Sequence, residues 1–234
     1  MERDIVIPVA HEPNNDELRY CLRSLKNLPH RRVVIAGYLH TWINPDKVLH
    51  IPTNQTTLRT RFLRSGHNIR TAFADKRLTS EIILFNDDFY CIKPVKELPI
   101  HHRGTFDDLL NGEYKTLNSS WVRMLRRTNS ILKAYYQSTY CYELHMPMAI
   151  NRKIYLEIYK KYNKRTAHMH GSTRSLYANM MQLGGTQIPD VKVYKPESPI
   201  PDTGFISSAP GSWQPGSLQR YVKNLFKEKS QYEL

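Results

Sequence analysis

The chain has 234 residues, 40% hydrophobic and 24% charged, and its 34 lysines and arginines against 21 aspartates and glutamates give a net charge of +13. This composition excludes wholesale disorder, a collagen-like repeat and a low-complexity chain, and the length suffices for one domain with a sizeable core. The three cysteines have no short spacing, which argues against a disulfide framework and a cysteine-based zinc site.

No stretch of the sequence approaches the roughly 18–20 apolar residues that a membrane helix needs. The first residues lack the basic and then apolar segments of a signal peptide. We therefore expect a cytoplasmic protein without a membrane span. The excess of positive charge favours an anionic partner: nucleic acid, a nucleotide-linked substrate, a phosphorylated polymer or a membrane surface.

The first part of the chain predicts alternating strands and helices. Residues 5–9 and 33–36 are short apolar runs of the kind that form buried strands. Between them, residues 18–25 place leucine and cysteine at the spacing of one face of an amphipathic helix. This order predicts a βαβ unit and hence a parallel sheet. Asn14 or Asn15 would cap the helix.

The later segments extend this pattern. Residues 93–115 and the Pro/Gly/Ser-rich stretch 196–215 are predicted as loops, and Ser217 is the predicted cap of the last helix. Further strands are expected at 48–51, 81–85 and 191–194, and further helices within 55–74, 117–136, 152–162, 172–181 and 218–227. Because no internal repeat or sharp linker interrupts the sequence, a single domain over residues 1–234 is expected.

Two aspartates follow the clearest predicted strand. Residues 81–85 run into Asn86, Asp87 and Asp88, and ligands of open α/β sheets bind beyond the carboxyl ends of the strands. Paired aspartate oxygens suit Mg²⁺ or Mn²⁺, which can bridge a carboxylate and a diphosphate. The alternative is that both aspartates belong to the next turn, where Asp and Asn are common.

The connection after the first strand is a second candidate region. It leads into a helix whose first turn contains Asp16 and Glu17, and whose backbone amides could hold an anion. Arg19 and Arg23 follow on one helical face, four residues apart. They would reach phosphate groups or be solvated, and their spacing alone favours the solvated alternative.

The second half of the chain adds a histidine and an arginine. His145, just before a Met-Pro pair, is a candidate general base near neutral pH, although a single histidine is more often structural. Arg174 could neutralise a diphosphate leaving group or lie on the surface. His168 and His170 have no acidic or cysteine ligand nearby, so we discount them as a metal pair. The basic, aromatic-flanked helix 121–133 would bind a polyanion or present a solvated face.

Three blocks of the sequence, in order and in rough spacing, resemble the Stealth family. They are residues 15–25 (NDELRYCLRSL), 83–90 (ILFNDDFY) and 145–147 (HMP). Stealth proteins are sugar-phosphate transferases of bacterial capsule synthesis, and their relatives include the lysosomal-enzyme N-acetylglucosamine-1-phosphotransferase. The chain is similar, more closely still, to compact phage-encoded proteins usually called glycosyltransferases. The features shared with these are residues 174–177, 184–186, 190–193 and 232–233.

The resemblance implies an α/β fold of the GT-A-like (Rossmann-like) nucleotide-diphospho-sugar transferase type, with a mostly parallel central sheet and additional helices. Residues 1–92 would form the nucleotide-sugar-binding half and residues 93–234 the acceptor and catalytic half. Asp87 and Asp88 would hold Mg²⁺ or Mn²⁺ on the donor diphosphate. The implied catalytic residues are Asp88, His145 and Arg174, and the implied donor-binding residues are Asp16, Glu17, Arg19, Arg23, Asn68 and Asn86.

Several alternatives stay open at this level. The Stealth N-terminal block normally continues into a Trp-Val-Asp/Asn-Gly stretch, which residues 7–11 replace here, so the group transferred is either a sugar or a sugar-1-phosphate. The acceptor would be an anionic polymer such as DNA, a virion protein or a cell-envelope glycan. A second hypothesis is a non-catalytic, basic nucleic-acid-binding protein, and the two merge in a transferase that acts on modified phage DNA. No helix-turn-helix, zinc-finger or RRM signature supports the second hypothesis.

Overall fold

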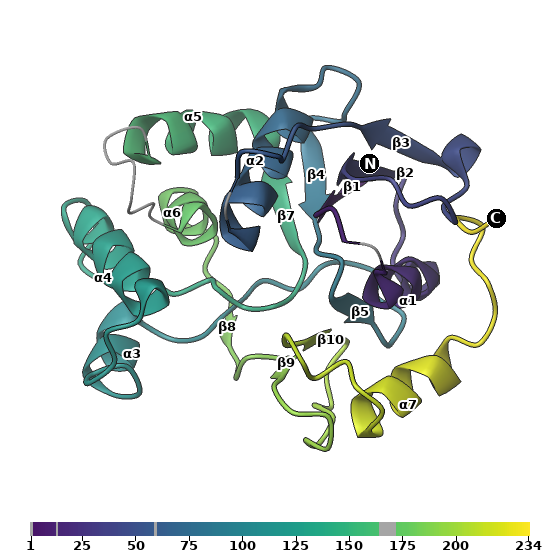
Figure 1. The fold of residues 1–234 in the computed structure, drawn as a ribbon. Helices are drawn as coiled ribbons and strands as arrows, with labels where there is room; N and C mark the ends of the chain where they lie inside the picture. Colours follow the sequence, from purple (N-terminus) through teal and green to yellow (C-terminus); the bar gives the residue numbers. More distant parts are fainter. Residues whose placement is uncertain (1, 13, 59, 164–171) are drawn as a thin grey trace. The chain divides into compact units, whose positions relative to one another are not determined.

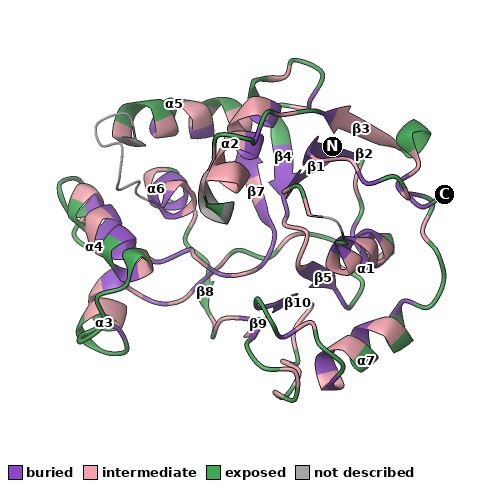
Figure 2. Cartoon of the chain, in the orientation of Figure 1, coloured by how far each residue is buried: buried purple, intermediate pink, exposed green. Residues whose placement is uncertain are grey.

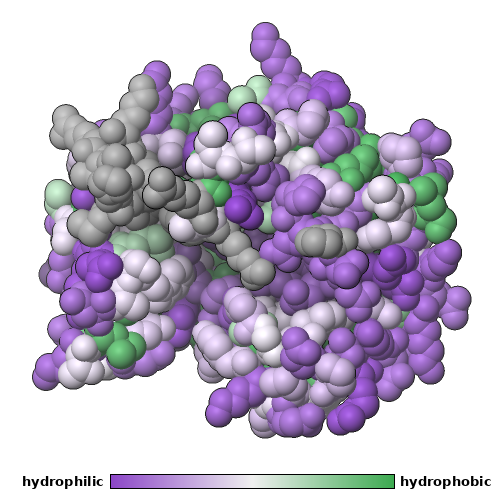
Figure 3. Space-filling model, in the orientation of Figure 1, coloured by the Kyte–Doolittle hydropathy of each residue, from purple (hydrophilic) through white to green (hydrophobic). Residues whose placement is uncertain are grey.

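The computed structural model describes residues 2–12, 14–58, 60–163 and 172–234. The candidate histidines 168 and 170 lie outside these residues. Within them, no helix combines the length and the apolar character that crossing a membrane requires. The face seen in Figure 3 is mainly hydrophilic, with hydrophobic residues scattered in small groups. The three cysteines are unpaired, as their spacing predicted.

The chain forms two compact units. The first comprises Met1–Leu98, His145–Arg152 and Val191–Leu234, and the second comprises Pro99–Leu144 and Lys153–Asp190. The chain therefore leaves the first unit after Leu98 and returns to it twice. These two units are not successive along the chain, so they differ from the expected division into residues 1–92 and 93–234. That division, which was drawn by function, stays a prediction.

The first unit contains a five-stranded sheet in the order β3-β2-β1-β4-β7 (Figure 1). Four strands run parallel: β1 (Asp4–Val9), β2 (Arg32–Gly37), β3 (Val48–Ile51) and β4 (Glu81–Leu84). The edge strand β7 (Met148–Asn151) pairs antiparallel with β4. An α/β fold with a mostly parallel central sheet is therefore confirmed, and it is compatible with a Rossmann-like arrangement.

The strand order reverses beside β1. Helix α1 (Asp16–Ser24) and the short 3-10 helix η1 (Leu25–Asn27) connect β1 to β2, which confirms the predicted βαβ unit. After β3, which follows the short helix η2 (Pro45–Lys47), helix α2 (Arg61–Ala74) carries the chain to β4 on the other side of β1. In open α/β sheets such a switch point opens a ligand-binding crevice between the two carboxyl strand ends.

Burial explains why the parallel strands read as apolar runs. Every residue of β1 is buried, and β4 is exposed only at Glu81, where the strand is green in Figure 2. Strands covered on both faces lose the polar alternation of half-exposed strands. Pro8 is tolerated in β1 because it follows the last pair between β1 and β4, Val6 with Leu84, and so lacks a neighbour on that side.

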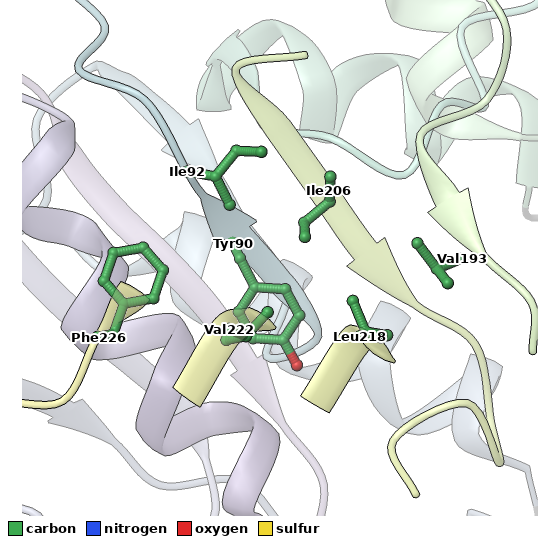
Figure 4. Close-up of a cluster of buried hydrophobic side chains, with 7 residues drawn as sticks. All are labelled: Tyr90, Ile92, Val193, Ile206, Leu218, Val222 and Phe226. Carbon is green, nitrogen blue, oxygen red and sulfur yellow. The ribbon is translucent and has the colours of Figure 1, made fainter. Parts of the chain in front are cut away.

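A second sheet of the first unit has the order β5-β10-β9. It consists of β5 (Phe89–Cys91), β10 (Phe205–Ser208) and β9 (Lys192–Val193), with helix α7 (Ser217–Leu225) packed on it. Figure 4 shows Leu218 and Val222 of α7 facing the side chains of the sheet. The buried cluster consists of Tyr90, Ile92, Val193, Ile206, Leu218, Val222 and Phe226.

Two predictions for this part of the chain were wrong. The stretch 196–215 is not all loop, because β10 lies within it. Ser217 is the first residue of α7 and not its cap: Gly216 occupies the cap position, and the Ser217 hydroxyl donates to the Pro196 carbonyl at 2.6 Å.

The second unit is mainly helical. It contains α3 (Phe106–Asn111), α4 (Ser120–Lys133), α6 (Thr173–Met180) and all of α5 (Arg152–Asn163) beyond its first residue. A small parallel pair joins β6 (His101–His102) to β8 (Thr186–Gln187). The prediction of a loop over 93–115 was wrong, since β6 and α3 lie there and Thr105 caps α3.

Candidate functional site

A cavity of about 250 Å³ lies where β1 and β4 end in the first unit. Half of its lining residues come from the connection between β1 and α1 and from the turn after β4. This is the switch point of the sheet, where a ligand is expected. The lining residues are Pro8, Ala10, Glu12, Asn15, Glu17, Ser65, Asn86, Asp87, Asp88, Lys192, Ser208 and Pro210. We call this cavity the acidic pocket.

The charge of the acidic pocket is opposite to that of the whole chain. Its lining carries four carboxylates, on Glu12, Glu17, Asp87 and Asp88, and one ammonium group, on Lys192, although the chain as a whole has a net charge of +13. Such a lining repels a bare polyanion and attracts a cation, or an anion that arrives together with a cation.

Asn15 links the first turn of α1 to Asp87. Its Oδ1 accepts from the backbone N–H of Leu18 at 2.8 Å, which makes Asn15 the helix cap, and its Nδ2 donates to Asp87 Oδ2 at 2.7 Å. Burial, together with the charge of Asp88, raises the pKa of Asp87 to about 7, even though the Asn15 hydrogen bond acts in the opposite direction. Asp87 is therefore held in place, and it forms no ion pair with a cation among the residues that the structure describes.

Asp88 has a weaker set of contacts. Its Oδ2 lies 3.4 Å from Ser207 Oγ and 3.7 Å from Lys192 Nζ, while its Oδ1 is buried and accepts no hydrogen bond from the described residues. Burial raises the pKa of Asp88, although the charges of Lys192 and His145 act to lower it. Both aspartates also lie in the turn between β4 and β5, where Phe89 N–H donates to the Asn86 carbonyl at 3.3 Å, so the turn and the pocket use the same residues.

Glu17 joins the pocket to the second sheet. The Ser208 hydroxyl donates to Glu17 Oε1, and Tyr90 Oη lies 3.2 Å from Ser208 Oγ. Because Ser208 belongs to β10 and Tyr90 to β5, this chain of hydrogen bonds fixes the Glu17 carboxylate against a rigid sheet. Glu17 and Asn86 are the two predicted donor-binding residues that line the pocket.

His145 belongs to the first unit and precedes β7 closely. It is half-buried and does not line the pocket, but its charge acts on Asp88. The structure thus brings His145 near the aspartate pair.

Arg19 and Arg23 point to the C-terminus of the chain. Arg19 Nη1 lies 2.9 Å from Glu233 Oε2, and Arg23 donates to both Glu233 oxygens, from Nε at 2.7 Å and from Nη2 at 2.8 Å. Burial raises the pKa of Glu233, but the hydrogen bonds from Arg23, Ser230 and Arg19 outweigh it and lower this pKa to about 2. We call this arrangement the arginine–glutamate clasp; neither arginine lines the acidic pocket.

Asp16 and Asn68 also lie outside the pocket lining. The Asp16 carboxylate accepts from Trp213 Nε1 at 3.4 Å and pairs with Lys223 at 3.3 Å, which ties α1 to α7. The buried Asn68 amide donates to the Val9 carbonyl at 3.0 Å and accepts from Thr53 at 2.6 Å. Asn68 therefore fixes the end of β1, next to the pocket wall that Pro8 and Ala10 form.

Arg174 is the second residue of α6 and belongs to the second unit. Burial lowers its pKa, and the charges of Glu143, Tyr155 and Asp190 act in the opposite direction. Glu143 accepts hydrogen bonds at the start of α6, from the Ser175 hydroxyl at 2.8 Å and from the Ser172 hydroxyl. The catalytic role of Arg174 stays a prediction.

Sequence reasoning missed several residues of the pocket. Glu12, Ser65, Lys192, Ser207 and Ser208 were not among the candidates, although all but Ser207 line the cavity and Ser207 contacts Asp88. Lys192 lies within residues 190–193, one of the shared features, and this was the signal that could have found it. The two serines gave no signal because they lie in a stretch that was predicted as loop.

The aspartate pair fits a divalent cation that arrives with its ligand. In the described part of the chain, no group of three or more His, Cys, Asp or Glu side chains is arranged to hold a metal ion. Mg²⁺ commonly binds through one or two carboxylates and the phosphates of a substrate, without a complete protein cage. The buried Asp88 Oδ1 without a hydrogen-bond donor suits this kind of site.

Comparisons with known proteins leave the family open. No protein-family model matches the sequence, and no curated protein is significantly similar to it. The resemblance to Stealth proteins therefore stays a prediction.

Proposed function

We propose that the chain is a metal-dependent glycosyltransferase of the GT-A-like type. It would move a sugar, or a sugar-1-phosphate, from a nucleotide-sugar donor to an acceptor hydroxyl. The observation that carries this proposal is the acidic pocket, which presents Asp87 and Asp88 at the switch point of a mostly parallel sheet. Nucleotides bind open α/β sheets at this place.

The aspartate pair is the proposed metal site. When bound, Mg²⁺ or Mn²⁺ stabilises negative charge on a phosphoryl oxygen and on the leaving diphosphate. Asp87 and Asp88 would hold the ion, and Asn15 keeps Asp87 oriented through the 2.7 Å hydrogen bond. A cation at this position would also relieve the repulsion between two buried carboxylates.

Other residues of the pocket suit a donor rich in hydroxyl groups. The carboxylate of Glu17, fixed by Ser208, can accept hydrogen bonds from sugar or ribose hydroxyls. Asn86 offers both a donor and an acceptor at the same wall. His145, which lies within electrostatic reach of Asp88, is the proposed general base, and its neutral imidazole would take the proton of the acceptor hydroxyl.

The non-catalytic nucleic-acid hypothesis has less support. The acidic pocket would repel bare phosphates, and two cations of α4 make local contacts. Arg123 donates to the Asn118 carbonyl at 2.7 Å, and Lys133 pairs with Asp107 at 2.7 Å. An anionic polymer such as DNA, a virion protein or a cell-envelope glycan is kept as the proposed acceptor class.

A thermal-shift panel tests the proposal. The protein is heated with UDP-, GDP-, ADP-, CMP- and dTDP-linked sugars, each with Mg²⁺, with Mn²⁺ or with a chelator. A ligand at a hundred times its Kd stabilises the native state by about 2.7 kcal/mol. We expect a shift that requires both the metal and one nucleotide family, and that Asp87→Asn and Asp88→Asn abolish. Absence of a shift with every donor and both metals would contradict the proposal.

A further inference from the structure

Lys192 is the one cation among the described residues that line the acidic pocket. Its side chain is 12% exposed, and its Nζ lies 3.7 Å from Asp88 Oδ2. This distance allows an ion pair but exceeds the length of an N–H···O hydrogen bond. Within the described part of the chain, the Lys192 ammonium donates no hydrogen bond.

An ammonium group has three N–H donors, and leaving them unused in a nearly buried position is costly. The ion pair with Asp88 offsets part of the charge but satisfies none of these donors. The four carboxylates of the pocket also exceed the single lysine in number, so Lys192 is not there to make the lining neutral. Its unused donors point to a ligand that supplies oxygen acceptors.

The position of Lys192 is set by backbone pairing. In the second sheet Lys192 lies beside Ser207, and Val193 lies beside Ser208, in a parallel ladder. Successive side chains of a strand point to opposite faces. Since Val193 is part of the buried cluster in Figure 4, Lys192 points away from that cluster, toward Asp88. The lysine is therefore presented by a sheet whose β5 strand begins directly after Asp88.

We propose that Lys192 binds the diphosphate of the donor. Phosphate oxygens would accept hydrogen bonds from the ammonium N–H groups of Lys192, which do not donate to Asp88. This inference rests on the proposed function and names the side chain that recognises the anionic part of the substrate. A diphosphate entering the pocket meets four carboxylates, and Lys192, together with a metal ion held by Asp87 and Asp88, would offset their repulsion. Charge-assisted N⁺–H···O⁻ bonds to phosphate are stronger than neutral ones.

Isothermal titration calorimetry with nucleoside diphosphates tests the inference. UDP, GDP, ADP, CDP and dTDP are titrated into the wild-type protein with Mg²⁺, and the tightest binder is then used for three variants. We expect Lys192→Met to weaken binding roughly 10-fold or more, by loss of a charge-assisted contact. We expect Lys192→Arg to stay within about threefold of the wild type. Lys195→Met is the control, because it removes the same charge from an exposed lysine outside the pocket lining.

Two results would overturn the role of Lys192. One is a Lys192→Met variant that binds the diphosphate as the wild type does. The other is a loss that Lys192→Arg does not reverse, together with a lower melting temperature of unliganded Lys192→Met, which would make Lys192 a support for Asp88. If the wild type binds none of the five diphosphates with Mg²⁺ and shows no thermal shift with any nucleotide sugar, the proposed function itself fails. The two failures are thus distinguished by the wild-type titration.

Discussion

The segment of Asn15 and helix α1 contacts two carboxylates with different partners: Asp87, which is partly buried, and Glu233, which is buried. At its start, Asn15 donates to Asp87, which pairs with no arginine in the described part of the chain, and the pKa of Asp87 rises to about 7. Along its length, Arg19 and Arg23 hold Glu233, and the pKa of Glu233 falls to about 2. The clasp thus contains its own cations, whereas the acidic pocket has fewer cations than carboxylates.

The same helix thus contributes to stability at the clasp and to the proposed functional site at the acidic pocket. A buried carboxylate with two arginines is complete and contributes to stability. A partly buried pair of carboxylates with one distant lysine disfavours its own charge and is stabilised by an added cation. Active sites are where such incompletely compensated groups are found. The motif of residues 15–25 therefore serves two purposes, one at the pocket and one at the clasp.

The largest expected effect is the loss of activity on changing the pocket. Asp88→Asn should reduce metal-dependent transfer by roughly a hundredfold or more, because a neutral amide is a poor ligand for Mg²⁺ or Mn²⁺. Its melting temperature at pH 8 should equal or exceed that of the wild type, since one of two repelling buried charges is removed. Product formation by mass spectrometry and thermal melts measure the two effects. Asp75→Asn, in a carboxylate paired with Arg77 outside the pocket lining, is the matched control.

Breaking the clasp should lower the stability of the fold and leave ligand binding unchanged. Glu233→Ala leaves two arginines without their carboxylate, so the free energy of unfolding should fall by about 2–4 kcal/mol. Binding of a nucleotide sugar to the fraction that remains folded should be unchanged, because Glu233 does not line the pocket. Urea denaturation measures the first effect and calorimetry the second. Unchanged stability would show that the clasp adds nothing to the fold; Glu228→Ala, nearby on the same tail, is the control.

The two carboxylates should also differ in the direction of their pH dependence. Glu233 has a folded pKa of about 2 and an ordinary value near 4.5, so its stabilising effect should be present above pH ~4.5 and lost as the pH falls toward 2. Asp87 has a folded pKa of about 7 against 3.8, so its ionisation should cost stability increasingly as the pH rises from about 4 to 7.

Difference melts isolate these contributions. The wild type minus Glu233→Gln should shrink below pH 4.5, and Asp87→Asn minus the wild type should grow between pH 4 and 7. Both series are measured with a chelator, because a bound metal would change the second. When both differences are taken as wild type minus variant, the Glu233→Gln curve should rise with pH and the Asp87→Asn curve should fall. Two curves that change in the same direction would contradict the contrast between pocket and clasp.

The contrast also shows what the sequence could predict. The parallel sheet was predictable because residues 5–9 and 33–36 are apolar runs on either side of a helical pattern. The carboxylates at the end of β4 were predictable because a strand end is a local signal. The partner of Arg23 was not, since Glu233 lies 210 residues away and no local pattern links them.

The contribution of β10 was beyond local reasoning for another reason. Its sequence, Phe205–Ser208, is half serine and lies between proline- and glycine-rich segments, which is typical of a loop. It is a strand because β5 and β9 pair with both of its edges and its residues are buried. Tertiary pairing outweighs intrinsic propensity in such a strand, and it brings Ser207 to Asp88 and Ser208 to Glu17.

The smallest expected effect concerns the support of the clasp. Tyr232 Oη lies 2.6 Å from His30 Nε2, and His30 Nδ1 lies 2.6 Å from the Leu28 carbonyl, so Nδ1 carries the proton and the tyrosine donates to Nε2. Tyr232→Phe should therefore lower the free energy of unfolding by about 1 kcal/mol, less than Glu233→Ala. Urea denaturation beside Tyr221→Phe, at an exposed tyrosine of α7, measures the difference. A loss as large as that of Glu233→Ala would mean that the hydroxyl, and not the buried ion pairs, holds the tail in place.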